Sequence, residues 1–476
     1  MCAVHTAAIP TRHVAPAPAF SVFAWLWAAG ILFHMASYSE PVEPVTVVML
    51  VSALAVIFAA SRTAAFFTLV AAHLLYVYFR LPRVPNHSVL TAAIDITILA
   101  AAAWLAVRER TLRIDLTSLY RSFAPVVRIE LLILYFYVVF HKLNSGFFNA
   151  EHSCGSFMYL RLAREYPFLP TANWVRWSAI FLTIVIEAAI PLMLVVGRVR
   201  LAGLLLAFLF HFALAMDPGD VVFNFSSILI ALFFLFLPES SAPVILDVVT
   251  SLRDRLLSML RAPRRAAKAA AFAVVAPLAA VLIFREGIPT GLTFETSRAV
   301  WVVYAAAILA LFVAALRKAR PDFQPTHELI AVGTPGLLVI PALLVLNGLL
   351  PYVGLKTETS FAMYSNLHTE GGRTNHWFMS PRLQVWNYQR DLVRVRRTSV
   401  SQIQRLANRG YVWTYYEFKW MIQEHPDASV TYEHNGVIRR VPRVADAPEL
   451  APGNRLLRKF LRFRPVAGSD RTLCIH

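Results

Sequence analysis

Charged residues are scarce in this chain of 476 residues. Only 15% are Asp, Glu, Lys or Arg, while 58% are hydrophobic, and the mean hydropathy is +0.56. A soluble globular protein of this composition could not cover itself with polar surface. We therefore expect an integral membrane protein whose main partner is the lipid bilayer, and we expect no nucleic-acid partner, because the net charge of +17 comes from basic residues in short loops and in the C-terminal region.

Cysteines are also few. Cys2, Cys154 and Cys474 contain no Cys-x-x-Cys pair, which excludes a disulfide framework and a zinc site. The first 19 residues lack a continuous apolar stretch, so they read as an N-terminal tail and not as a cleaved signal peptide.

Apolar stretches of membrane-spanning length recur between residues 20 and 350. The expected spans are Phe20–Tyr38, Val45–Ala60, Ala64–Phe79, Val89–Val107, Val126–His141, Trp174–Val196, Leu201–Met216, Val221–Leu237, Ala269–Phe284, Ala299–Leu316 and Leu329–Leu350. Among the shorter stretches, Val45–Ala60 and Ala269–Phe284 are the weakest candidates, so the count is ten or eleven. Arginines and lysines gather in alternate loops, which places the N-terminus in the cytoplasm and the C-terminal region outside.

Residues 351–476 change to a mixture of polar, aromatic and charged residues and read as a separate domain. Thr414–His425 is expected to form an amphipathic helix, and Ser429–Val441 a hairpin around Asn435-Gly436. The basic stretch Asn454–Phe463 lies either against lipid headgroups or in solvent. The expected fold is an all-α polytopic membrane bundle with a small α+β extramembrane domain.

Lys142 ends an apolar helix, where a lysine is costly. From its position alone, snorkelling of the ammonium to the headgroups is the simpler interpretation. The alternative is an apolar pocket that disfavours the charged form and leaves a free amine to act as a base.

Glu187 lies deep in the sixth span, one turn before Pro191. It should face the interior of the bundle, where it pairs with an arginine or histidine, stays protonated, or relays protons. Four further polar residues are expected at the same level as Lys142, each of which alone reads as a helix cap or an interhelical hydrogen bond: Asn86, His87, His211 and Asn224.

The order of several short motifs resembles the membrane region of the vitamin K-dependent γ-carboxylases and their bacterial relatives, the horizontally transferred transmembrane domain family. These motifs are Asn86-His87-Ser88, Tyr135-Phe136, His141-Lys142-Leu143, Met158-Tyr159-Leu160 and Tyr166-Pro-Phe-Leu-Pro170. The resemblance covers roughly residues 20–238 and, through the bacterial relatives, implies the inner membrane of a bacterium. It departs from the family at His141, where the usual motif is a Lys-Lys pair, and in the short C-terminal region, which makes recognition of a clotting-type propeptide doubtful.

The resemblance implies a quinol- and oxygen-driven carboxylation of glutamate in a peptide or protein at the outer face. Lys142 would be the base that deprotonates a reduced quinone of the vitamin K or menaquinol type, and carbon dioxide would be the group added; no metal is implied. His211, Asn86 and His87 would assist catalysis, while Tyr135, His141 and Asn224 would contact the quinol. The alternative function is a non-catalytic membrane protein, either a transporter or a partner-binding scaffold, that keeps the family fold.

A polar segment after the last span is expected to fold over the outer mouth of the bundle. Its candidate lining residues are Ser365, Asn366, Glu370 and His376, although Gly371-Gly372 is more typical of a simple turn. His376 and Glu370 are too few for a metal site. Cys154 and Cys474 are both expected outside, where they either form a disulfide or remain free thiols.

Overall fold

The structure is a computed structural model that describes residues 17–58, 63–217, 219, 222–259, 263–285, 290–319, 323–467 and 474. Most of the expected N-terminal tail, with Cys2, lies outside these residues. Within them, nine helices are long and apolar enough to cross a membrane, and two shorter apolar helices accompany them. The protein is therefore a helical membrane bundle, as the composition predicts, and it carries a small antiparallel sheet near the C-terminus.

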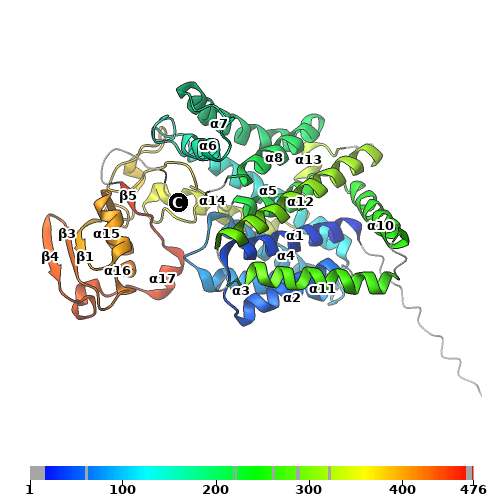
Figure 1. The fold of residues 1–476 in the computed structure, drawn as a ribbon, viewed down its shortest axis with the longest axis horizontal. Coiled ribbons are helices and arrows are strands. Elements are labelled where there is room, and N and C mark those ends of the chain that lie inside the picture. The colour runs from blue at the N-terminus through cyan, green and yellow to red at the C-terminus, as the bar shows by residue number, and fades with distance from the viewer. Residues whose placement is uncertain are drawn as a thin grey trace, which may run out of the picture.

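The helices of the bundle follow the expected spans closely. They are α1 (Pro18–Tyr38), α2 (Pro44–Phe58), α3 (Thr63–Arg80), α4 (Asn86–Glu109), α5 (Leu116–Phe140), α7 (Asn173–Val195), α8 (Arg200–Ala215), α9 (Val222–Phe234), α11 (Arg264–Ile283), α12 (Thr290–Ala319) and α14 (Val339–Val353). Most of them run side by side along the length of the molecule, and the C-terminal domain lies at one end, called here the domain end (Figure 1).

Helix α1 lies at the centre of the bundle. Its side chains Phe23, Trp27 and Ile31 are completely buried, and it packs along α9. Gly30 allows this approach, because a Cβ atom there would lie 2.9 Å from the Ile228 side chain. The central helix is thus shielded from lipid, whereas α7 and α11 expose most of their surface, which suits helices that face lipid.

Several observed helices begin before the expected spans, most clearly α5 and α12, which begin ten and nine residues before Val126 and Ala299. Helix α5 begins early because Asp115 caps it, accepting from Ser118 N at 2.8 Å. Within the span, Arg128 donates to the carbonyls of Leu235 at 2.8 Å and Leu329 at 2.7 Å. The last span begins at Pro335 and not at Leu329, because Gly333 and Pro335 separate a short helix, α13 (Thr326–Leu329), from the 3₁₀ turn that leads into α14.

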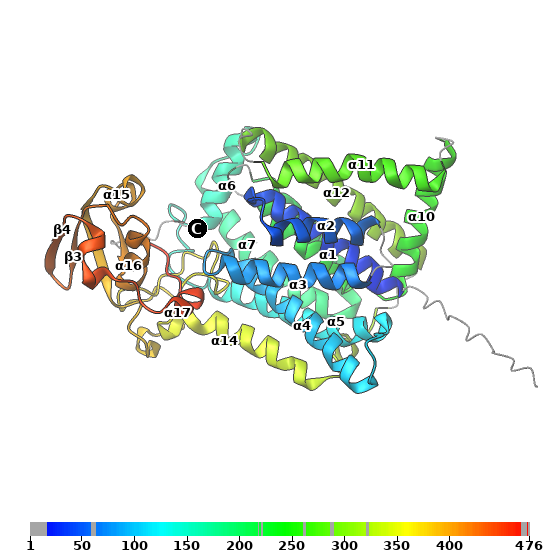
Figure 2. The same cartoon turned by 90° about the horizontal axis from the view of Figure 1, so that it is seen from below.

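Helices α6 (Cys154–Glu165) and α10 (Ser241–Met259) are not anticipated by the hydropathy pattern. Helix α10 carries Arg253 and Arg255, which the hydropathy pattern leaves in a loop between two spans. It lies across the end of the bundle opposite the C-terminal domain (Figure 2). Helix α6 lies at the domain end, against α7. Both helices are amphipathic or polar, so their mean hydropathy over a window of membrane-spanning length is too low to identify them.

The C-terminal domain has α+β structure. It comprises β1 (Leu392–Thr398), α15 (Ser401–Asn408), β2 (Tyr411–Thr414), α16 (Tyr415–Gln423), β3 (Val430–His434), β4 (Val437–Val441), α17 (Arg455–Phe460) and β5 (Val466–Ala467). The strands form an antiparallel sheet in the order β4-β3-β1-β2-β5. The expected hairpin is β3–β4, and Asn435 and Gly436 have φ angles of 52° and 76°, as a two-residue turn of this kind requires.

Residues 354–391, called here the lid segment, connect α14 to the sheet. Its backbone bonds directly to the loop after α5: Trp377 N donates to the Leu143 carbonyl at 3.0 Å, and Ser145 N to the Asn375 carbonyl at 3.1 Å. Gly371 and Gly372 have φ angles of 71° and 72°, which shows the turn that the sequence favours there. The lid segment therefore closes the domain end of the bundle.

Candidate functional site

Lys142 and Glu187 form a buried ion pair near the domain end. The Lys142 ammonium donates to both carboxylate oxygens of Glu187, at 2.7 and 3.0 Å. Their side chains are only 4% and 9% exposed, and the Phe147 ring lies 5.7 Å from the ammonium. Snorkelling would require the Lys142 side chain to extend to the surface. Instead the side chain is buried, and its partner is a carboxylate from α7.

A second polar pair lies beside the first. The Tyr135 hydroxyl is 2.8 Å from His211 Nε2, and both side chains are buried. Tyr135 and Val138 share one face of α5 because their spacing of three residues matches the helical period, and Lys142 lies in the turn that follows this helix. Glu187 of α7 and His211 of α8 complete one group of four polar side chains.

These four side chains line one cavity of about 380 Å³. This volume lies within the range of sites for small organic molecules, about 300–1,000 Å³. The remaining lining is mostly apolar and comes from α5, α6, α7, α8, α9 and the lid segment: Leu134, Val138, Phe147, Gly155, Met158, Tyr159, Leu162, Ala179, Leu182, Thr183, Ile186, Phe210, Ala213, Leu214, Asp217, Val222, Phe225, Met363 and Tyr364. The cavity therefore has a mostly apolar wall, which the group of four polar side chains interrupts at one place and Asp217 at another.

The lid segment covers the cavity but contributes different residues from those expected. Met363 and Tyr364 line it, whereas Ser365 and Asn366 hold the segment in place. Asn144 Nδ2 donates to the Ser365 carbonyl at 2.7 Å, and the Asn366 side chain accepts from Cys154 N at 2.7 Å.

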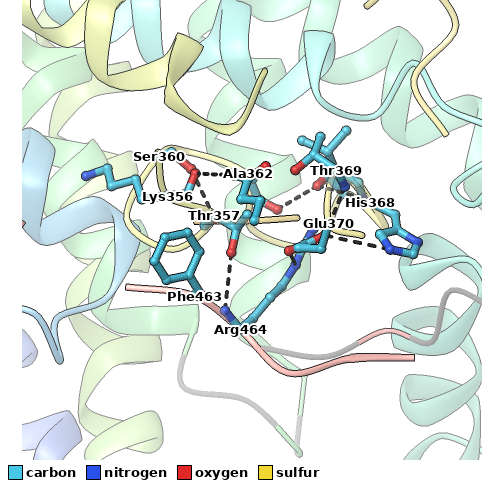
Figure 3. Close-up of polar contacts among 12 residues, drawn as sticks. Lys356, Thr357, Ser360, Ala362, His368, Thr369, Glu370, Phe463 and Arg464 are labelled. Atoms are coloured by element: carbon cyan, nitrogen blue, oxygen red, sulfur yellow. Dashed lines mark hydrogen bonds and ion pairs between the residues drawn. The ribbon is translucent and has the colours of Figure 1, made fainter. Parts of the chain in front are cut away.

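Glu370 and His376 also hold the lid segment in place. Glu370 is completely buried, accepts from Thr369 N at 2.9 Å, and lies 3.5 Å from Arg464 Nε, so it ties the lid segment to the end of the C-terminal domain (Figure 3). His376 Nε2 lies 2.9 Å from the Phe140 carbonyl. Neither residue reaches the cavity lining.

A disulfide joins Cys154 to Cys474, 320 residues further along the chain, with a Cα–Cα distance of 5.0 Å. Cys154 begins α6, and the next residue, Gly155, lines the cavity. The bond thus attaches the C-terminal tail to the wall of the cavity.

Four other candidates lie outside the cavity lining. Asn86 accepts a hydrogen bond from Phe361 N at 2.7 Å and so holds the lid segment. His141 Nδ1 lies 2.7 Å from the Tyr352 hydroxyl. The Asn224 side chain donates to the Tyr38 hydroxyl at 2.9 Å. His87 Nε2 lies 3.3 Å from His34 Nδ1, away from the cavity lining.

Sequence reasoning singled out Lys142 and Glu187 independently but did not pair them, because only the packing of α7 against α5 brings them together. It missed Asp217, which lines the cavity and binds Arg161 at 2.7 Å, and it missed the whole of α6. Among the described residues, no group of three or more His, Cys, Asp or Glu side chains is arranged to hold a metal ion.

Comparisons with protein-family models, with curated proteins and with solved structures find no match for this chain.

Proposed function

We propose that this protein is a carboxylase-like membrane enzyme in which Lys142, supported by Glu187, is the base for a quinol. The observation that carries the proposal is the buried Lys142–Glu187 pair on the wall of an apolar cavity. A scaffold protein that merely keeps the fold has no need of this arrangement, since an intramembrane ion pair is expensive and usually functional.

The pair can hold a proton in two ways. In water the ammonium–carboxylate form dominates, but inside an apolar site the desolvation of both charges brings the neutral amine–carboxylic acid form closer in free energy. A proton that moves from Lys142 Nζ to Glu187 leaves a free amine. That amine can then accept a proton from a quinol hydroxyl, while Glu187 keeps the first proton within 3 Å.

The cavity fits a lipid-soluble substrate with one polar end. Its wall is formed mainly by carbon atoms, and Leu182, which lines it, is 55% exposed on the outer surface of α7. A quinol of the vitamin K or menaquinol type would enter from the bilayer beside α7 and place a hydroxyl near Lys142, with Tyr135 and His211 to orient it. The enclosing lid segment would exclude water from a reactive base.

Oxidation of the quinol by oxygen would supply the driving force for removal of a γ-proton from a glutamate side chain and for addition of carbon dioxide. In this proposal the domain end is the outer face of a bacterial inner membrane, and the acceptor is a peptide or protein on that side.

The test incubates membranes that contain the protein with reduced menaquinone or vitamin K, oxygen, labelled carbon dioxide and a glutamyl peptide. Lys142→Ala should abolish incorporation. Lys142→Arg should abolish it too, because an arginine keeps the positive charge beside Glu187 but does not release a proton. The control is Lys356→Met, which removes the other buried lysine of the described residues, outside the cavity.

Full activity in Lys142→Arg would show that the pair is structural and would refute the role of Lys142 as the base. Equal incorporation in wild type and Lys142→Ala, or none in any variant, would refute the proposed reaction.

A further inference from the structure

A loop within the lid segment exposes large apolar side chains at the domain end of the bundle. It comprises residues 377–386 and is called here the aromatic loop. Its exposed apolar members, with the exposed fraction of each, are Trp377 (51%), Phe378 (70%), Leu383 (46%), Val385 (72%) and Trp386 (44%). A contiguous exposed patch of apolar side chains marks a contact with a protein, a ligand or a membrane.

Trp377 continues the lipid-facing surface of α7. Its ring lies 4.6 Å from the Phe148 ring, and the Phe148 ring lies 5.6 Å from that of Phe181. Phe181 is 51% exposed and lies eight residues into α7, about 12 Å from the start of that helix at 1.5 Å per residue. Because only two ring contacts separate Trp377 from a side chain inside the span, Trp377 lies level with the first turns of α7, within reach of the bilayer.

Phe378 continues the exposed surface of α5 in the same way. Phe136, one turn before the end of α5, is 58% exposed and stacks on Phe140 with 5.4 Å between the rings. The Phe140 ring lies 4.6 Å from the His376 ring, which lies 6.0 Å from the Phe378 ring. A second row of rings thus runs from a membrane-spanning helix into the aromatic loop.

The other end of the aromatic loop lies against the end of α14. Val385 N and Trp386 N donate to the carbonyl of Val353, the last residue of that helix, at 3.1 and 3.2 Å. Helix α14 lies at an edge of the bundle and exposes Leu343 and Leu346 (Figure 2). The aromatic loop is therefore continuous with the exposed apolar surfaces of three membrane-spanning helices, α5, α7 and α14.

The charges around the aromatic loop suit lipid headgroups. Residues 371–390 carry three arginines at exposed positions, Arg373, Arg382 and Arg390, and no aspartate or glutamate. Basic side chains at the membrane surface are attracted to anionic lipids. Trp377 and Trp386 begin and end the loop, and tryptophan is enriched at the boundary between hydrocarbon and water because its apolar ring carries a polar N–H. A bilayer thus matches both the apolar and the charged side chains.

We propose that the aromatic loop inserts into the headgroup region of the bilayer beside α5, α7 and α14, and so fastens the lid segment to the membrane. Trp377, Phe378 and Val385 reach the hydrocarbon boundary, while Arg382 lies among the headgroup phosphates. A soluble partner would have to cover a surface that continues onto three spanning helices, whereas lipid already surrounds those helices. The insertion concerns the contact between lid and lipid and does not depend on the proposed carboxylation.

The experiment measures the membrane depth of nitroxide labels on the full chain in bilayers of phosphatidylcholine and phosphatidylglycerol. Cys2→Ser leaves no reactive thiol, because Cys154 and Cys474 form a disulfide. Single labels are then attached through Phe378→Cys or Val385→Cys, each of which leaves the rest of the loop intact. Electron paramagnetic resonance compares collisions of each label with oxygen, which concentrates in lipid, and with a nickel chelate, which stays in water.

Two reference positions have the same exposed fraction, 59%, in different surroundings. Val185 lies on the outer surface of α7, and Ile438 lies on β4, at the end of the C-terminal domain remote from the bundle (Figure 1). Labels attached through Val185→Cys and Ile438→Cys therefore report the values for lipid and for water. The labels at positions 378 and 385 should give an oxygen-to-nickel collision ratio near the Val185 value and several-fold above the Ile438 value.

A collision ratio at both loop positions equal to that at Ile438 would refute the insertion. Low collision with both reagents would refute it too, because a protein surface, such as a second copy of this chain, would then cover the loop. Neither substrate nor turnover is needed, so failure of the insertion is distinguishable from failure of the proposed carboxylation.

Discussion

The Lys142–Glu187 pair makes a strong prediction about stability. Lys142→Met leaves the Glu187 carboxylate without its cation in a site where its side chain is 9% exposed. Removal of one partner of a buried pair typically costs about 3–5 kcal/mol, while replacement of both partners by apolar side chains is often close to neutral. We therefore expect each of Lys142→Met and Glu187→Leu to be strongly destabilising.

The double variant Lys142→Met/Glu187→Leu should be more stable than either single variant. If each single change costs about 3 kcal/mol and the double change about 1 kcal/mol, the coupling free energy between the two sites is about 5 kcal/mol. Unfolding free energies would be obtained from SDS titration in mixed micelles, followed by intrinsic tryptophan fluorescence. Additive costs in the double variant would refute the pairing on which the candidate site rests.

Two further predictions concern packing and pH. Gly348→Ala should cost about 1–3 kcal/mol, because its Cβ atom would lie 2.3 Å from the Tyr137 ring, whereas Gly336→Ala, with no atom within 4 Å, should be nearly neutral in the same SDS titration. Burial lowers the pKa of Lys356 from 10.5 to about 8, so the buried ammonium should destabilise the fold by about 3 kcal/mol below pH 8. Because the unfolded chain binds more protons between pH 8 and 10.5, stability should rise with pH across that window in wild type; a flat profile in wild type, or the same rise in Lys356→Met, would contradict this assignment.

The membrane bundle and its helix order could be predicted from the sequence because lipid imposes a simple rule. Each span must satisfy its own backbone hydrogen bonds and present apolar side chains over a fixed length, so hydropathy alone locates helices such as α7 and α12. The hairpin at Asn435-Gly436 could also be predicted, because the positive φ angles at both turn residues are a local requirement that Asn and Gly meet.

The residues of the candidate site could be predicted from the sequence only in part. Lys142, Glu187, Tyr135 and His211 were singled out as costly or motif residues, and all four line the cavity. Asn86 and Asn224 were selected on the same grounds, yet they hold the lid segment and Tyr38, respectively. Depth in the membrane identifies which polar residues need a partner, but it does not say in which direction each side chain points.

Local composition is enough to predict that this chain crosses a membrane many times and that polar side chains gather near the ends of several spans. Which of these side chains meet depends on how the helices pack. Lys142 pairs with Glu187, 45 residues away, because α7 packs against α5, and His34, His73 and His87 meet because α1, α3 and α4 converge. Such pairings depend on how helices rotate and pack against one another, which hydrophobic patterning constrains only loosely in lipid.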